Sequence, residues 1–296
     1  MSIATTPPSL AVLPDPPAPP ATLGLIAGGG RLPILVAKGM REAGHPVRVV
    51  GLTGQYDNEL REHCDELQEA PVLRLAHWSS LLRQMGARHA VMVGRVDKAS
   101  LMYSWRAIVR NRPDIRVFKA WMRSRHDRRS NRLLTYVADE LARDGIHLID
   151  STTHITEHMA HEGPMTRRTL SPRQRTDMEL GWPILRELLR LDIGQALAVR
   201  DGDIIAVEAV EGTDRMIERA GELCKKQGWT LIKAARAGHD RRSDVPTIGV
   251  RTVEHLHAHG GRAIVVASGD VIIIDKPETI ARADELGVAI HGLSPA

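Results

Sequence analysis

The chain has 296 residues, of which 43% are hydrophobic and 26% are charged, values typical of a globular protein that buries one or two sizeable cores. Aromatic residues make up only 3%, which disfavours the base-stacking surfaces that bind single-stranded nucleic acid. The net charge of +4 suits a small anionic ligand and does not require a polyanion. We therefore expect no nucleic-acid partner.

The chain contains two cysteines, Cys64 and Cys224, which lie far apart and lack metal-type spacing. Such a pair supports neither a disulfide framework nor a zinc ribbon, so a reducing cytoplasm fits best. No apolar run approaches the roughly 20 residues of a membrane span, and the N-terminus lacks the pattern of a signal peptide. The sequence predicts a cytoplasmic protein.

Residues 1–21 are rich in proline and alanine without a hydrophobic period, which predicts an extended or disordered tail. The next part, 22–152, is predicted to form a Rossmann-like nucleotide-binding domain, because strand-like runs alternate with helical periods. The expected strands cover 23–27, 47–52, 72–75, 90–93 and 146–149, and the expected helices cover 31–44, 78–86, 103–122 and 131–144.

After Asp150 the apolar period gives way to breakers, hydroxyls and histidines, so we place the domain junction there and predict a second, mixed α/β domain over 153–296. Asp201 and Gly202 separate two apolar runs, a pattern that predicts a hairpin, since this dipeptide tolerates positive φ. The other expected elements are helices over 172–191, 213–227, 253–259 and 277–286 and strands over 230–235, 246–250, 263–266 and 271–274.

Three glycines, Gly28, Gly29 and Gly30, follow the first strand and precede a helix with Pro33 in its first turn. Glycines at a helix N-terminus let backbone N–H groups approach a phosphate, which favours nucleotide binding. The spacing is not G-x-G-x-x-G and no acidic residue closes the second strand, so NAD is disfavoured. A tight turn without a ligand is the plain alternative.

Two segments of the second half gather the groups that phosphoanhydride hydrolysis needs, carboxylates for a divalent metal and cations for phosphate charge. These are Glu208, Glu211, Thr213 and Asp214 in the first segment, and Lys233, Arg236, Asp240 and Asp244 in the second. In the plain alternative Thr213 is a helix N-cap, Asp214 a partner of the helix dipole, and Arg241 with Arg242 a solvated turn.

The segment with His154, Glu157 and His158 spells H-x-x-E-H, the order found in one class of zinc peptidases. A helix would place both imidazoles on one face, but no third ligand is evident, and Gly163 with Pro164 limits the segment to about two turns. We interpret it as a helix or lid. A zinc hydrolase built on His154 and His158 stays an alternative. The chain shows no P-loop, no G-x-S-x-G elbow and no C-x-x-C pair.

Four stretches carry a family resemblance: LGLIAGGGRLP at 23–33, RLDIGQ at 190–195, VEAVEGTD at 207–214 and IKAARAGHDRRSDVPTIGV at 232–250. They resemble the LpxI family, the UDP-2,3-diacylglucosamine pyrophosphatases of lipid A biosynthesis, over nearly the whole chain after the tail. The resemblance implies Mg²⁺-dependent attack of water at the α-phosphate, giving UMP and the diacylated sugar 1-phosphate. It implies a UDP-binding first domain, a second domain for the acylated sugar, and a ligand between them.

The resemblance and the chemistry of the side chains together assign residues. Asp244 matches the family's essential acid, which binds the metal or orients the attacking water, and Lys233 and Asp214 are the other candidate catalytic groups. Glu208 is the second candidate metal ligand. The nucleotide- and substrate-binding candidates are Gly28, Gly29, Gly30, Gly94, Arg95, Gln195, Thr213, Arg236 and His239.

The chain departs from the family pattern at Arg95, at the pair Ser130 and Asn131, and at His239. A diacylated product implies transient contact with the inner-membrane surface, so the expected location is cytoplasmic and peripheral to that membrane. The oligomeric state is left open, a homodimer included. A non-catalytic sensor of UDP-sugars or nucleotides is the alternative that uses the same glycine turn.

Overall fold

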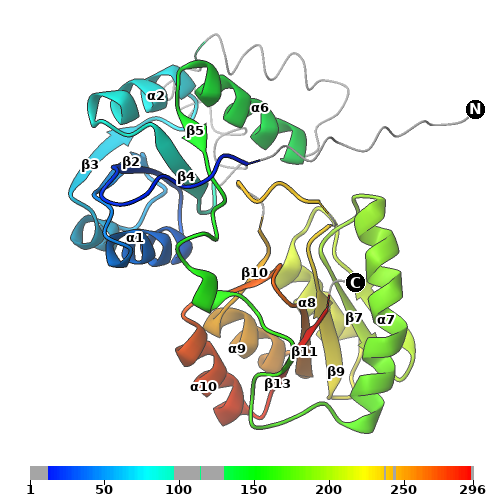
Figure 1. Cartoon of the computed structure of the whole chain (residues 1–296). Coiled ribbons are helices and arrows are strands. Elements are labelled where there is room, and N and C mark those ends of the chain that lie inside the picture. The colour runs from blue at the N-terminus through cyan, green and yellow to red at the C-terminus, as the bar shows by residue number, and fades with distance from the viewer. Residues whose placement is uncertain (1–12, 97–113, 115–129, 237, 243–244, 295–296) are drawn as a thin grey trace, which may run out of the picture. The chain divides into compact units, whose positions relative to one another are not determined.

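The computed structural model describes residues 13–96, 114, 130–236, 238–242 and 245–294, and of residues 130–133 it describes the backbone alone. The chain divides into two compact units (Figure 1). Unit 1 extends to His154 and also takes in 240–242 from the second half, and unit 2 contains the described residues of 155–239 and 245–296. Apart from Asp114, the predicted helix over 103–122 lies outside the described residues.

Unit 1 is built on a parallel sheet with the order β3-β2-β1-β4-β5. The central strand β1 is buried along its whole length, as expected for a strand covered on both faces. Helix α1 packs on β1 and β2, and α2 packs against α6, so helices cover both faces (Figure 1). The elements are β1 (Leu23–Ala27), α1 (Leu32–Glu42), β2 (Val47–Leu52), the 3-10 helix η1 (Asn58–His63), β3 (Glu66–Ala70), α2 (Leu75–Gln84), β4 (His89–Val93), α6 (Ser130–Arg143) and β5 (His147–Leu148).

The predicted strand over 72–75 is wrong. The strand in this region is β3, Glu66–Ala70, with the polar sequence ELQEA. It lies at the edge of the sheet, where the side chains of Glu66 and Glu69 are partly or fully exposed, so it lacks the apolar run by which a buried strand is recognised. The apolar side chains of Val72 and Leu75 are buried instead in the turn before α2 and at its start.

Unit 2 is a mixed sheet with the order β6-β13-β11-β9-β7-β8, plus a separate pair of strands, β10 and β12. Strands β9, β11 and β13 are parallel, while β7 runs antiparallel to β9 and β8 antiparallel to β7. The strands are β6 (Gly163–Pro164), β7 (Ala196–Arg200), β8 (Asp203–Val207), β9 (Trp229–Lys233), β10 (Thr247–Ile248), β11 (Gly261–Ala267), β12 (Ile272–Ile273) and β13 (Ala289–Leu293), and the helices are η3 (Thr156–His158), α7 (Pro172–Arg190), α8 (Thr213–Leu223), α9 (Val250–Ala258) and α10 (Lys276–Leu286).

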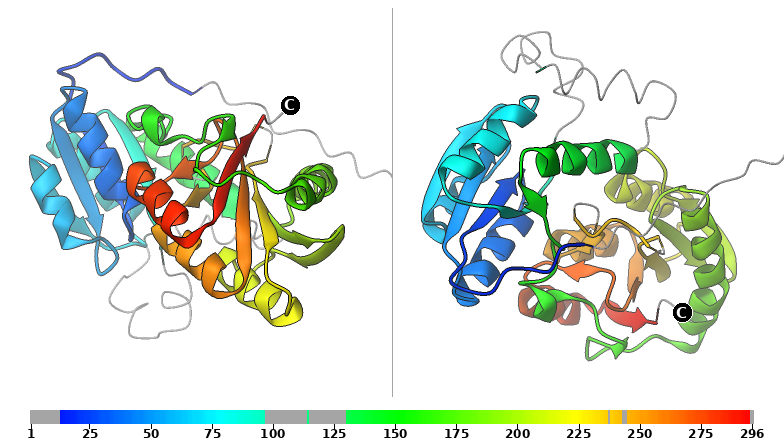
Figure 2. Two further views of the ribbon diagram at one scale, coloured as in Figure 1. Left: turned by 90° about the horizontal axis from the view of Figure 1, so that it is seen from below. Right: turned by 45° about the horizontal axis from the view of Figure 1, so that its top comes forward.

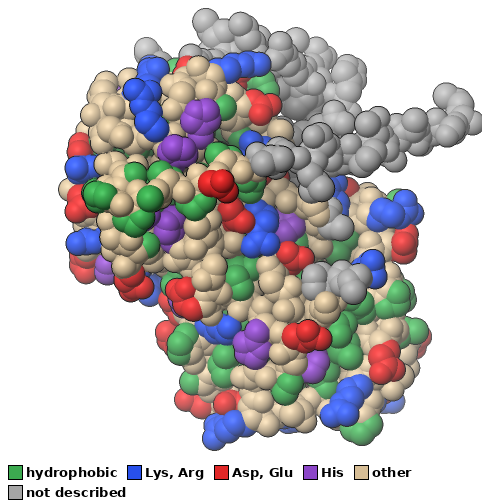
Figure 3. Space-filling view, in the orientation of Figure 1, with side chains coloured by type: hydrophobic (Ala, Val, Ile, Leu, Met, Phe, Trp, Pro, Cys, Tyr) green, Lys and Arg blue, Asp and Glu red, His purple; other side chains and the backbone are tan. Residues whose placement is uncertain are grey.

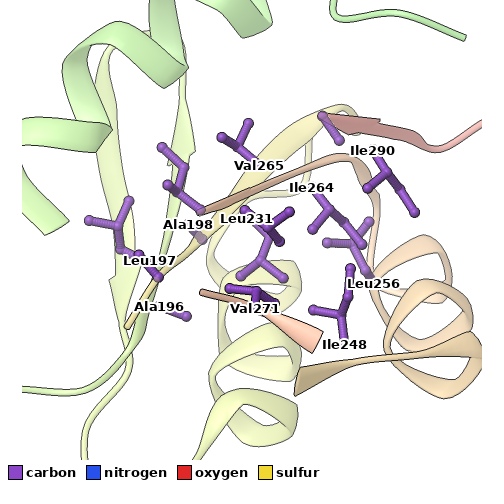
Figure 4. Close-up of a cluster of buried hydrophobic side chains, with 14 of the residues drawn as sticks. Ala196, Leu197, Ala198, Leu231, Ile248, Leu256, Ile264, Val265, Val271 and Ile290 are labelled. Atoms are coloured by element: carbon purple, nitrogen blue, oxygen red, sulfur yellow. The ribbon is translucent and has the colours of Figure 1, made fainter. Parts of the chain in front are cut away.

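Helix α7 covers one face of this sheet, and α8, α9 and α10 cover the other (Figure 2). Gly181 lets α7 approach closely, because a Cβ there would lie 2.5 Å from the side chain of Ile232. Between the sheet and α8 to α10 lies an aliphatic core that includes Leu231, Ile264 and Leu256 (Figure 4). The core fixes the strand ends on which the polar residues of unit 2 stand.

The predicted α/β class is confirmed, with a parallel sheet in unit 1 and a mixed sheet in unit 2. The predicted hairpin is also confirmed: Asp201 and Gly202 adopt φ of 53° and 82°, and the buried Asp177 accepts a hydrogen bond from the Gly202 N–H at 2.9 Å. Strand β13 was not predicted, since His291 and Gly292 interrupt its apolar run. Gly292 is required there because a Cβ would collide with the carbonyl oxygen of His161.

Candidate functional site

The glycine turn Gly28–Gly30 follows β1 and packs on the continuation of β4. The Gly28 N–H donates to the Val93 carbonyl at 2.9 Å, and the Gly29 N–H donates to the Arg95 carbonyl at 2.8 Å. Two of the three N–H groups that we expected to face a ligand are therefore used within the protein. Gly30 and the first turn of α1 are the parts of this turn that can still offer backbone donors to an anion.

The close approach of two backbones explains why glycine stands at both Gly28 and Gly94. A Cβ on Gly28 would lie 2.7 Å from the Arg95 carbonyl oxygen, and one on Gly94, where φ is +102°, would lie 2.7 Å from the Gly28 carbonyl carbon. Neither distance is tolerable for a side chain. The tight-turn interpretation thus accounts for these two glycines, whether or not a ligand binds.

The side chain of Arg95 brings a cation to this turn. Its Nε and Nη2 atoms lie 3.7 Å from the position that a Cβ of Gly30 would occupy, and the residue is exposed. Positive charge beside the N-terminal end of α1 adds to the helix dipole in favouring an anion. The order of the sheet reverses between β1 and β4, and in open α/β sheets this switch point is where ligands bind.

A third segment reaches the same edge of the sheet. Strands β1, β4 and β5 are parallel neighbours, so their carboxyl ends lie on one side. The residues that follow β5, including Asp150, Ser151 and Thr152, therefore stand on the same edge as the glycine turn. They hold Arg241, whose Nε lies 2.8 Å from the Asp150 Oδ2.

The interpretation of Arg241 and Arg242 as a solvated turn is wrong. Arg241 is an ion-pair partner of Asp150, and Arg242 grips the carboxylate of Asp240 with Nε at 2.8 Å and Nη2 at 2.6 Å. The Asp240 carboxylate, and to a lesser extent the charge of Asp139, raises the pKa of Arg242. The Arg241 and Arg242 side chains are only 30% and 13% exposed. Their burial is tolerated because the carboxylates of Asp150 and Asp240 pair with them.

A chain of three polar side chains stands at one edge of the unit 2 sheet. The ammonium of Lys233, at the end of β9, donates to the Thr213 hydroxyl at 2.8 Å, and that hydroxyl donates to the Glu208 Oε1 at 3.0 Å. Lys233 and Glu208 are both buried, with 7% and 9% of their surface exposed. Burial of two charges is tolerated here because one hydroxyl bridges them.

The turn before β7 completes this cluster. The Gln195 N–H donates to the Glu208 Oε2 at 3.3 Å, and the Gln195 carbonyl accepts from the Ala234 N–H at 3.0 Å. Gly194 adopts φ of 57°, and a Cβ there would collide with the Glu208 carbonyl oxygen. The start of β7, the ends of β8 and β9 and the first residue of α8 thus meet at one point, and they unite the predicted site residues Gln195, Glu208, Thr213 and Lys233.

The other two carboxylates of the VEAVEGTD segment have separate partners. Glu211 pairs with Arg219 at 2.5 Å, and hydrogen bonds from its own backbone N–H and from Arg219 lower its pKa. Asp214 pairs with Arg251 at 2.5 Å. Gly212, with φ of 81°, is the N-cap of α8, so Thr213 is the first helical residue. Its hydroxyl therefore does not cap the helix, and it bridges Lys233 and Glu208 instead.

His239 presents a buried nitrogen without a partner among the described residues. Its Nδ1 lies 3.1 Å from the Arg236 carbonyl oxygen, which can only accept, so the neutral ring carries its proton on Nδ1. The Nε2 is then an acceptor that is buried and unsatisfied. Such an orphan is costly unless a ligand or water supplies a donor, which agrees with the predicted binding role of His239.

Two protein-family models match the chain, one over each half. The model of the LpxI N-terminal domain matches residues 22–158, and that of the LpxI C-terminal domain matches 161–291. The chain belongs to the LpxI family. The UDP-2,3-diacylglucosamine pyrophosphatase LpxI of Caulobacter vibrioides is 28% identical over 280 residues, which cover 92% of this chain and 98% of that protein.

A solved structure also matches, that of the biotin carboxylase domain dimer of the Hydrogenobacter thermophilus 2-oxoglutarate carboxylase with MgADP, ADP and bicarbonate. The identity is 13%, and the match covers 68% of this chain and 40% of that one, with a TM-score of 0.24. The chain therefore spans well under half of that protein's length.

Asp244, the acid that the LpxI resemblance marks as essential, lies outside the described residues, and so does Ser243. Within the described part of the chain, no three His, Cys, Asp or Glu side chains gather as a metal-binding group. Among the described residues, the Glu208 carboxylate accepts from the Thr213 hydroxyl that also binds Lys233. Mg²⁺ prefers oxygen ligands and takes one or two protein carboxylates, so the chemistry of Glu208 suits that ion.

The histidines of the zinc alternative have unrelated surroundings in this LpxI-family chain. His154 packs edge to face on His45, with ring centroids 5.1 Å apart, whereas His158 accepts from the Lys276 N–H at 3.4 Å. Of the two interpretations, a helix or a lid, the helix with both imidazoles on one face is wrong: turns over 151–154 lead into the short 3-10 helix η3. Among the described helices, none combines the length and the apolar character that crossing a membrane requires.

Proposed function

We propose that this chain hydrolyses the pyrophosphate bond of UDP-2,3-diacylglucosamine, giving UMP and 2,3-diacylglucosamine 1-phosphate for lipid A biosynthesis. Family membership supports this, as does a relative that carries the name of this activity and matches over 98% of its own length. The structural observation behind the proposal is the buried chain of Lys233, Thr213 and Glu208, which holds an ammonium group at a strand end.

In the proposed reaction a water oxygen bonds to the α-phosphorus while the bond from that phosphorus to the bridging oxygen breaks. The bridging oxygen leaves with the β-phosphate, and the negative charge on the phosphoryl oxygens is spread during the transfer. Such transfers depend on positioning and on fixed positive charge rather than on covalent chemistry. Lys233 and Arg236 supply that charge from unit 2.

Asp244 is proposed as the group that binds the metal or orients the water, since an ionised carboxylate can do either. With Glu208 and the substrate phosphates it would hold Mg²⁺, which supplies charge stabilisation when bound. Asp214 stays a candidate catalytic group, although its described partner is Arg251 and not the Lys233 chain.

The two ends of the substrate have different candidate positions. We assign the UDP end to unit 1, where Gly30 and the exposed guanidinium of Arg95 favour an anion. We assign the acylated sugar to unit 2, where Gln195 and Thr213 lie in the Lys233 cluster and His239 offers an unsatisfied nitrogen.

Exposed apolar side chains stand beside the unit 2 cluster and suit an acylated substrate. Val210 is fully exposed two residues after Glu208, and Leu191 and Ile193, before Gln195, are 56% and 41% exposed. These three residues form what we call the apolar rim. Figure 3 shows hydrophobic side chains mixed with charged ones over the α7 side of unit 2. We propose that the rim touches the membrane surface while the substrate is taken up.

The decisive experiment is a UMP-release assay that compares UDP-2,3-diacylglucosamine with UDP-GlcNAc in the presence of Mg²⁺. We expect release from the diacylated substrate and loss of most turnover in Asp244→Ala with substrate binding kept. No UMP from either substrate at high enzyme concentration would sink the proposal. Binding of UDP-sugar without turnover would instead indicate a sensor, and stoichiometric zinc in chelator-free protein would favour a zinc hydrolase.

A further inference from the structure

Segment 240–242 belongs by sequence to the second half of the chain and by its contacts to unit 1. The chain leaves unit 2 after His239, contributes these residues to unit 1 and rejoins unit 2 at Val245. Asp244 follows Arg241 by three positions in the sequence. Whatever fixes Arg241 therefore also fixes the point from which the chain leads to Asp244.

Arg241 is fixed through both its backbone and its side chain. Its carbonyl accepts from the Ser151 N–H at 3.0 Å and from the Ser151 hydroxyl at 2.7 Å. Its Nη2 donates to the Thr152 hydroxyl at 2.7 Å, and its Nε stands 2.8 Å from the Asp150 Oδ2. The contacts join residues about 90 positions apart, so no local turn makes them.

The residues that bind Arg241 are held in place by hydrogen bonds of their own. The Asp150 Oδ1 accepts from the Thr152 N–H at 2.8 Å and from the Thr152 hydroxyl at 2.7 Å. One oxygen of the carboxylate thus shapes its own turn, and the other faces the guanidinium of Arg241. The Asp150 and Arg241 side chains are 28% and 30% exposed, so the pair is better shielded from solvent than an ordinary surface ion pair.

We propose that Arg241 is a positioning residue for the hydrolysis. Its clasp on Asp150, Ser151 and Thr152 holds the segment before Asp244 on the sheet edge that carries the glycine turn. The inference rests on the proposed function and deepens it. It assigns a positioning role to a contact at the end of β5. The edge is shared because β1, β4 and β5 are parallel neighbours.

The physical reason for such a clasp is the sensitivity of phosphoryl transfer to geometry. A shift of about 1 Å in a reacting group reduces rates by roughly 100-fold, even when the cause lies away from the chemistry. A segment that crosses from one unit to the other is exposed to any motion of either unit. An arginine that meets carboxylate and hydroxyl together fixes direction as well as distance.

The test uses the full chain and the variants Arg241→Ala, Arg241→Lys, Asp150→Ala and the double variant Arg241→Ala/Asp150→Ala. Arg282→Ala is the matched control, because Arg282 pairs with Glu254 and Glu285 at 2.8 Å on exposed helices of unit 2. The readouts are kcat and KM for UMP release, the affinity for UDP, the melting temperature, and hydrogen exchange of peptides that cover 238–246.

We expect Arg241→Ala to lower kcat by about 30- to 100-fold, with UDP affinity within threefold of wild type and faster exchange confined to 238–246. Arg241→Lys should recover part of the rate, since lysine keeps the charge but not the fork of donors. The double variant should lose less than the product of the two single losses, because both changes break the same ion pair between Arg241 and Asp150. Arg282→Ala should match wild type.

Three results would overturn the inference. The first is a kcat for Arg241→Ala within twofold of wild type. The second is a parallel loss of melting temperature, UDP affinity and exchange protection across unit 1, which would show a structural role. The third is a double variant whose loss of kcat equals the product of the two single losses, which would show that Arg241 and Asp150 act independently. If wild type itself releases no UMP, the proposed function fails and the positioning role fails with it, an outcome distinct from an active wild type with an equally active Arg241→Ala.

Discussion

The buried side chains of Lys233 and Glu208 are bridged by one atom, the hydroxyl oxygen of Thr213. This oxygen lies 2.8 Å from the Lys233 Nζ and 3.0 Å from the Glu208 Oε1. A bridging hydroxyl accepts from the ammonium and donates to the carboxylate at the same time. The hydroxyl thereby holds the Lys233 ammonium in one orientation at the end of β9.

Replacing Thr213 by valine tests this bridge. Valine keeps the shape of threonine but removes the hydroxyl, so the Lys233 and Glu208 groups each lose a partner. We expect about a tenfold loss of kcat in UMP release and a loss of roughly 1–3 kcal/mol in unfolding free energy. Thr213→Ser, which keeps the hydroxyl, is the control. Equal activity of the valine and serine variants would show that the bridge is dispensable.

A second prediction concerns the backbone packing at Gly28. Alanine at this position would place its Cβ 2.7 Å from the Arg95 carbonyl, a contact that only a shift of β4 or of the turn can relieve. We expect Gly28→Ala to abolish measurable UDP binding and to lower the melting temperature of unit 1. Calorimetric titration and thermal unfolding provide the two measurements.

Gly86→Ala is the matched control for Gly28→Ala. Gly86 has φ of +81° with nothing within 4 Å of an added Cβ, so it tests backbone conformation alone, at a cost of roughly 1 kcal/mol. UDP binding should survive in it. A Gly28→Ala variant no less stable than Gly86→Ala would contradict the packing argument.

The apolar rim makes a third prediction. Val210→Asp should weaken cosedimentation with anionic liposomes severalfold and raise KM for UDP-2,3-diacylglucosamine, because it puts a charge where an acyl chain or membrane surface is proposed to lie. Leu223→Asp is the control, since Leu223 is 64% exposed but stands at the other end of α8 from the cluster. Equal binding of both variants to liposomes would show that the apolar rim does not touch the membrane surface.

His154 makes the fourth prediction. Burial, together with the neighbouring His45, lowers the pKa of His154 below its usual value of 6.5. The unfolded chain then binds the proton more readily than the folded one, so unfolding free energy falls as pH drops below about 6.5. When the pH is lowered from 7.5 to 5.5, the free energy of unfolding of unit 1, measured by urea titration, should fall more in wild type than in His154→Gln. Identical pH slopes would count against a buried neutral His154.

Much of the fold could be predicted because it is locally determined. The run 23–27 before the three glycines, the proline in the first turn of α1 and the Asp201–Gly202 pair each specify a backbone conformation within a few residues. The site residues Gln195, Glu208, Thr213 and Lys233 could be named from their segments. Their union at one strand edge follows from the antiparallel pairing of Ala196 with Lys233, which no local pattern contains.

What the sequence determined by itself is therefore the class of the fold, most of its elements and the family from its motifs. The tertiary structure decided which carboxylates pair with which cations: Glu211 with Arg219, Asp214 with Arg251, and Asp150 with Arg241. It also showed that the N–H groups of Gly28 and Gly29 donate to carbonyls at the end of β4 and just after it. The polar strand β3 forms an edge of the unit 1 sheet. The physical reason is distance along the chain. Periodicity reports a residue's own neighbours, whereas ion pairs and sheet edges depend on segments that lie 90 or more residues away.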